Sequence, residues 1–109
     1  MEMRFQDLNF AVSIIEKQFR RNRNRSISAT FHSLRRNSKL SFFGDWLLLG
    51  VIIKTIHQLG IYPSRNSILY AMNMSPELSK LPKREKTLLL EQLLKPSPVA
   101  MKQTKIASG

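Results

Sequence analysis

Cysteine is absent from this 109-residue chain. The absence excludes disulfide bridges and thiolate metal sites. Small secreted domains usually depend on such cross-links, so we expect a reducing, cytoplasmic location. The residues from Met1 to Asp7 mix acidic residues with Arg4, so we expect no secretory signal there.

Acidic residues and histidines are also scarce. The chain has seven Asp and Glu residues and two histidines, His32 and His57. Metal clusters, paired carboxylates and serine triads need more such groups, and the four glycines are too scattered for a phosphate-cradling loop. We therefore expect no enzymatic activity, no metal and no cofactor. For His57, within an apolar segment, we expect a partly buried structural role.

Long hydrophobic runs are missing too. The longest clean run, Trp46 to Ile53, has eight residues, whereas a membrane span needs about 20. This run predicts a buried helix. The amphipathic segment at residues 4–21 carries the acids Asp7 and Glu16, which do not suit a membrane surface. We expect no membrane partner.

Positive charge is abundant and clustered. The net charge is +11, and residues 17–39 carry eight basic residues and no acid. Residues 40–79 are neutral overall and the most apolar, which predicts the core there. Arginine suits bidentate phosphate contacts, so nucleic acid is the leading partner class. The predicted phosphate-binding residues are Arg20, Arg21, Arg23, Arg25, Arg35, Arg36 and Lys39.

Apolar residues recur at helical spacing near the N-terminus. Steps of 3, 4, 3 and 4 separate five large apolar residues, which predicts a helix over residues 4–21. Their stripe packs either within the domain or across a homodimer. It consists of Phe5, Leu8, Val12, Ile15 and Phe19.

Capping residues and prolines divide the rest of the chain. Ser26 predicts a short helix to about residue 36, with a strand as the alternative. A third helix begins at Ser41 or Asp45 and ends at Gly60. Gly50 inside it predicts the close approach of a neighbouring helix.

Three further helix starts are predicted after Gly60. Ser64 predicts a helix over residues 65–73, and Ser75 with Pro76 predicts a brief helix that Pro82 interrupts. Pro82 opens the last helix, which Lys95 and Pro96 end. The predicted fold class is thus an all-α bundle of about five or six short helices. Residues 1–95 form one domain, and residues 96–109 form a flexible, disordered basic tail.

The segment from Ile53 to Asn73 resembles a helix-turn-helix unit. One helix ends at Gly60 and a second begins at Ser64. In such units the start of the second helix enters the major groove. This resemblance implies base contacts by Ser64, Arg65 and Asn66. A helical hairpin that binds no DNA accounts for the same residues.

These observations favour a small nucleic-acid-binding protein, a transcription regulator or accessory factor, with DNA and RNA both open. The alternative is a non-enzymatic adaptor or assembly subunit that docks on an acidic protein partner through the same arginines.

Overall fold

The chain folds into helices throughout the described part. The computed structural model describes residues 5–95, and within them it contains helices and no strand. The all-α fold class is confirmed. Residues 1–4 and the predicted basic tail, residues 96–109, lie outside the described residues. The elements are α1 (Phe5–Arg21), α2 (Ile27–Arg35), the short 3-10 helix η1 (Ser38–Leu40), α3 (Asp45–Gln58), α4 (Arg65–Met74) and α5 (Lys83–Leu94).

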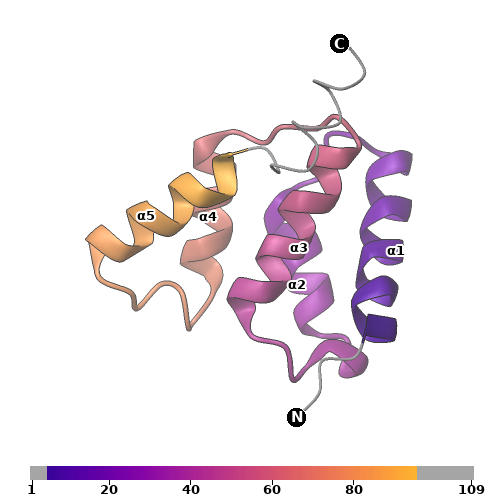
Figure 1. Cartoon of the computed structure of the whole chain (residues 1–109), viewed down its shortest axis with the longest axis horizontal. Helices are drawn as coiled ribbons and strands as arrows, with labels where there is room; N and C mark the ends of the chain where they lie inside the picture. Colours follow the sequence, from indigo (N-terminus) through magenta and orange to yellow (C-terminus); the bar gives the residue numbers. More distant parts are fainter. Residues whose placement is uncertain (1–4, 96–109) are drawn as a thin grey trace.

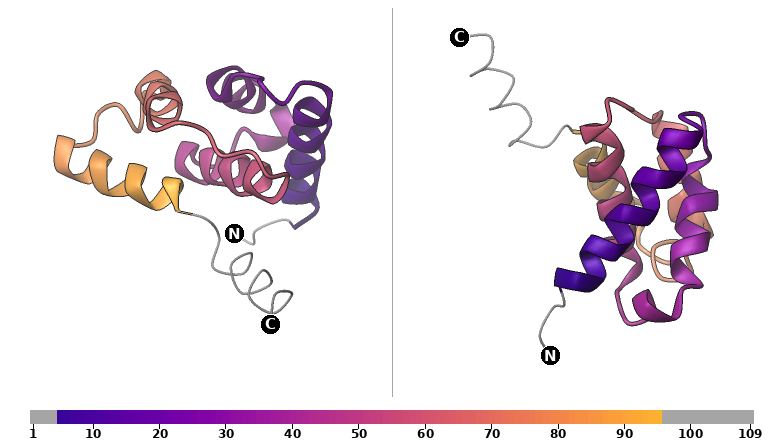
Figure 2. Two further views of the ribbon diagram at one scale, coloured as in Figure 1. Left: turned by 90° about the horizontal axis from the view of Figure 1, so that it is seen from above. Right: turned by 90° about the vertical axis from the view of Figure 1, so that its right-hand side faces the viewer.

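The helices run up and down beside α3, so that alternate loops lie at the same end. Helix α3 packs against α1, α2 and α5, whereas α4 packs against α2 and α5 (Figure 1). Seen from above, α1 and α5 still lie on opposite sides of α3 (Figure 2). The α1–α2 loop and the α3–α4 loop lie at one end of the bundle, and η1 lies at the other (Figure 1).

The stripe of α1 packs inward. Ile15 and Phe19 are at most 1% exposed and belong to the core, while Leu8 and Val12 are half-buried. These two buried residues therefore pack within the domain and are not available to a second copy. The side chain of Phe5 lies outside the described residues.

Helix α3 is central, as its apolar composition predicts. Leu49, Ile52 and Ile56 are fully buried, while a half-buried strip that includes Trp46 and Val51 runs along one side. The expected close approach at Gly50 is wrong, because no atom of another described residue lies within 4 Å of a Cβ atom built there.

The two ends of α3 differ from each other. Its N-cap is Gly44, so neither Ser41 nor Asp45 caps it. Its C-terminus closes at Gly60, as predicted: the Gly60 N–H donates to the His57 carbonyl at 3.0 Å, and the Ile61 N–H donates to the Ile56 carbonyl at 2.9 Å. This pair of bonds is the Schellman motif, and Gly60 adopts the positive φ of 79° that it requires.

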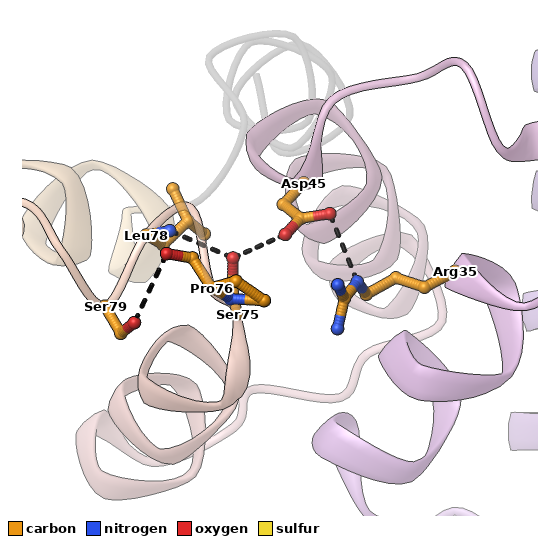
Figure 3. Close-up of polar contacts among 6 residues, drawn as sticks. All are labelled: Arg35, Asp45, Ser75, Pro76, Leu78 and Ser79. Atoms are coloured by element: carbon orange, nitrogen blue, oxygen red, sulfur yellow. Dashed lines mark hydrogen bonds and ion pairs between the residues drawn. The ribbon is translucent and has the colours of Figure 1, made fainter.

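Asp45 instead ties three segments together. Arg35 Nε of α2 lies 3.2 Å from Asp45 Oδ1, and Ser75 Oγ donates to Asp45 Oδ2 at 2.5 Å (Figure 3). The same Ser75 oxygen accepts from the Leu78 N–H at 2.9 Å. A buried carboxylate needs such partners, because losing water is costly for a charge.

The brief helix predicted after Ser75 is wrong. Residues 76–80 form a hydrogen-bonded turn, in which the Ser79 N–H donates to the Ser75 carbonyl at 2.9 Å. Pro82 disfavours the helical conformation at Leu81, so the turn is not extended. Helix α5 then begins directly after Pro82, as predicted.

Candidate nucleic-acid interface

The fold divides the basic segment between the two ends of α2. This helix has nine residues and is therefore about 13 Å long. Arg23 and Arg25 precede it, whereas Arg35, Arg36 and Lys39 lie at or beyond its C-terminal end. The seven predicted phosphate-binding residues therefore form two groups and not one surface.

The first group surrounds the α1–α2 loop. Arg20, Arg21 and Arg23 are exposed, and Arg25 is half-buried. The Arg20 guanidinium lies 4.0 Å from the Glu16 carboxylate, and both side chains remain solvated. Arg25 is held more firmly, since its Nε donates to Thr30 Oγ1 at 2.8 Å.

The loop itself has a defined conformation. The side-chain oxygen of Asn22 accepts from the Asn24 N–H at 3.0 Å, and its carbonyl accepts from the Arg25 N–H at 3.1 Å. Ser26 then caps α2, as predicted, by accepting from the Ala29 N–H. Asn22 thus shapes the turn that carries the arginines.

The second group consists of Arg35, Arg36 and Lys39, and two of these side chains contact other residues of the fold. Arg35 pairs with Asp45 and lies over the Phe31 ring, with its side chain only 30% exposed. The Lys39 ammonium lies 4.7 Å from the centre of the Phe10 ring. Arg36 is exposed. The structure therefore gives Arg35 a structural role that its position in the sequence did not reveal.

A groove of about 620 Å³ lies between α4 and the α1–α2 loop, residues 22–26, which we call the arginine loop. The α1–α2 loop contributes Arg23 and Arg25, and the opposite wall comes from the α3–α4 loop and α4. Among the residues that the structure describes, its lining contains these two arginines and no carboxylate. Arg23 reaches toward the α3–α4 turn, because a Cβ atom built on Gly60 would lie 3.8 Å from Arg23 Nη2. Segments about 40 residues apart in sequence thus form one surface.

The three residues predicted to contact bases have different environments. Ser64 caps α4, as predicted, by accepting from the Ser67 N–H at 3.2 Å. Arg65 forms an ion pair with Glu91 of α5, both half-exposed. Asn66 alone among the three lines the groove.

Two exposed tyrosines also line this groove, and sequence analysis did not single them out. Tyr62 and Tyr70 are 64% and 62% exposed. One signal was present for Tyr70: it follows Asn66 by four residues, which places both on one face of α4, away from the buried Ile68 and Ala71.

Tyr62 is supported by His57. The two rings stack at 5.1 Å between centroids, with 28° between their planes. His57 is 7% exposed, as its place on the core helix predicts, and burial lowers the pKa of its imidazole below 6.5. A neutral imidazole therefore lies beneath the tyrosine at neutral pH.

Within residues 5–95, no cluster of three or more His, Asp or Glu side chains is placed to hold a metal ion. None of the helices in this described range has both the length and the apolar content that crossing a bilayer requires.

Comparisons with protein-family models, with curated proteins and with solved structures find no match for this chain.

Proposed function

We propose that this chain is a small cytoplasmic nucleic-acid-binding protein that acts as a regulator or accessory factor and has no catalytic role. The observation that supports this proposal best is the groove, which joins the arginine loop to the first turns of α4. Its cytoplasmic location rests on the sequence alone.

The charge around the groove suits a polyanion. Arg23 and Arg25 line it, and the exposed Arg20 and Arg21 lie at the end of α1 that leads into the same loop. A guanidinium group can donate two parallel hydrogen bonds to one phosphate. The release of condensed counterions makes each such contact more favourable. The four arginines therefore form the proposed phosphate-binding surface, and Asn66 contacts bases from α4.

A salt titration tests the proposal. If four arginines contact phosphates, the slope of log K against log salt is about −3.6 for duplex DNA and about −2.8 for a single strand. Replacing Arg20, Arg21 and Arg23 together with alanine should reduce the slope by about 2 to 3. Arg25 is left intact because it also holds Thr30.

The control is the double substitution Arg36→Ala with Lys39→Ala, which removes two charges from the other end of α2. For each charge removed, it should change the slope by less than the groove substitutions do. Equal changes of slope per charge removed would mean that binding follows net charge and not this groove. Absence of binding to duplex and single-stranded nucleic acid at low salt contradicts the proposal, and binding to polyglutamate alone would support the adaptor alternative.

A further inference from the structure

We infer that the groove binds an unpaired nucleotide of a single strand, with its base stacked on Tyr62 and its phosphate on Arg23 and Arg25. This inference rests on the proposed nucleic-acid-binding function and specifies the form of nucleic acid that the groove accepts.

Tyr62 is suited to be a stacking platform. Most of its side chain is exposed, yet its ring already stacks on the buried His57. An exposed aromatic ring normally loses rotamer freedom when it binds a base, and contact with His57 reduces that cost beforehand. An incoming base would extend this stack, because it would lie on a ring that His57 already orients.

Groups that can donate hydrogen bonds to a phosphate and groups that can hydrogen-bond to a base line the same groove. Arg25 is oriented by its bond to Thr30 through Nε, which leaves its Nη groups as donors. Asn66 and Ser67 supply neutral hydrogen-bonding groups on the α4 side of the groove. Within residues 5–95, no carboxylate in the lining opposes a phosphate. The lining therefore offers cations, neutral polar groups and aromatic rings together.

This combination favours an unpaired strand over a duplex. In a duplex the base faces are covered by their neighbours, so exposed tyrosine rings have no face to contact. In a single strand every base offers a π-face, and stacking on an aromatic side chain contributes to affinity whatever the sequence. The groove volume of about 620 Å³ lies within the range of small-ligand sites.

The test compares strands and variants by fluorescence anisotropy of the full chain. The probes are labelled single-stranded DNA and RNA of about 12 nucleotides and a duplex of equal length. Tyr62→Ala should weaken single-strand binding by roughly 5- to 100-fold, while Tyr62→Phe keeps most of it. Duplex affinity should stay unchanged in both variants.

Two controls keep the result interpretable. Phe42→Ala removes another exposed aromatic side chain, 52% exposed and outside the groove, and should leave single-strand affinity unchanged. If Tyr62→Ala fails to fold, Tyr62→Leu preserves apolar bulk beside His57 while removing the stacking ring. Circular dichroism checks the fold of each variant.

The outcomes separate this inference from the proposed function. Duplex binding that exceeds single-strand binding, or unchanged single-strand affinity in Tyr62→Ala and Tyr62→Leu, overturns the unpaired-nucleotide inference and leaves nucleic-acid binding intact. Binding to neither strand form overturns both.

Discussion

Asp45 shows how one residue can change the meaning of its neighbours. In the sequence it is a candidate helix cap, but in the fold it is 9% exposed and accepts contacts from Arg35 and Ser75. The carboxylate thereby removes Arg35 from the set of free cations. A residue that the charge pattern assigns to a ligand is thus used to join α2, α3 and the turn after α4.

Asp45→Ala should lower the free energy of unfolding by about 2 kcal/mol, because Arg35 and the buried Ser75 both lose their acceptor. The matched control is Glu16→Ala, which also removes a carboxylate from an arginine pair but at the surface. It should cost less than about 1 kcal/mol. Chemical denaturation measures both, and equal losses would contradict the structural role of Asp45.

His57 should make stability depend on pH. Burial lowers its pKa below 6.5 in the folded chain. As the pH falls through 6.5, the unfolded chain takes up a proton that the folded chain does not, so stability decreases until the folded-state pKa is reached. Above that range its contribution is constant.

The measurement is the melting temperature between about pH 7.5 and pH 5.5, a range chosen to span the histidine titration. The decrease on acidification should be smaller in His57→Gln than in the unsubstituted chain. His32→Gln, which changes an exposed histidine of α2, is the control. An identical decrease in all three proteins would show that His57 does not cause it.

At the scale of elements, local chemistry predicted most helix boundaries. Ser26 and Ser64 cap α2 and α4, and Gly60 ends α3, because a cap satisfies backbone groups within a few residues of itself. The helix predicted after Ser75 is absent because, although Ser75 caps the turn, Pro82 lies too near for a helix to extend. The domain assignment, residues 1–95, stays a prediction.

Gly50 within α3 and Gly60 just beyond its C-terminus should respond oppositely to the same substitution. Gly50→Ala should raise the free energy of unfolding by about 1 kcal/mol, because alanine has the higher helix propensity and a Cβ atom added there has open space. Gly60→Ala should lower it by roughly 1–2 kcal/mol, because Gly60 has a φ of 79°.

Thermal and denaturant unfolding of the two variants checks the signs. A loss of stability in Gly50→Ala would mean that a neighbour approaches that position after all. A neutral Gly60→Ala would mean that the Schellman turn adapts to a side chain without cost.

At the scale of the whole molecule, tertiary packing decides where the charge gathers. Arg20, Arg21, Arg23 and Arg25 are brought to the end of the bundle where the α3–α4 loop also lies (Figure 1). Residues 5–95 carry 15 basic residues against six acidic ones, and in the compact state these like charges repel one another.

Salt should therefore stabilise the folded chain. Raising the salt concentration from about 0.01 M to about 0.1 M shortens the Debye length from roughly 30 Å to roughly 10 Å, and we expect the melting temperature to rise. The increase should be smaller when Arg20, Arg21 and Arg23 are replaced with alanine. A melting temperature that falls with salt would show that the ion pairs outweigh this repulsion.

The sequence by itself determined the helical class, the apolar face of α1, the caps of α2 and α4 and the amount of positive charge. These follow from residue spacing and from contacts within one or two turns. Only the tertiary structure decided that Arg35 and Arg65 are paired with carboxylates distant in sequence, and that Tyr62, Tyr70 and Arg23 line one groove. Such pairings depend on how helices pack, which no local pattern encodes. In the sequence, the arginine-rich segment and the helix-turn-helix-like segment are separate. The packing of α4 on α2 brings the N-terminal ends of these two helices together at the groove.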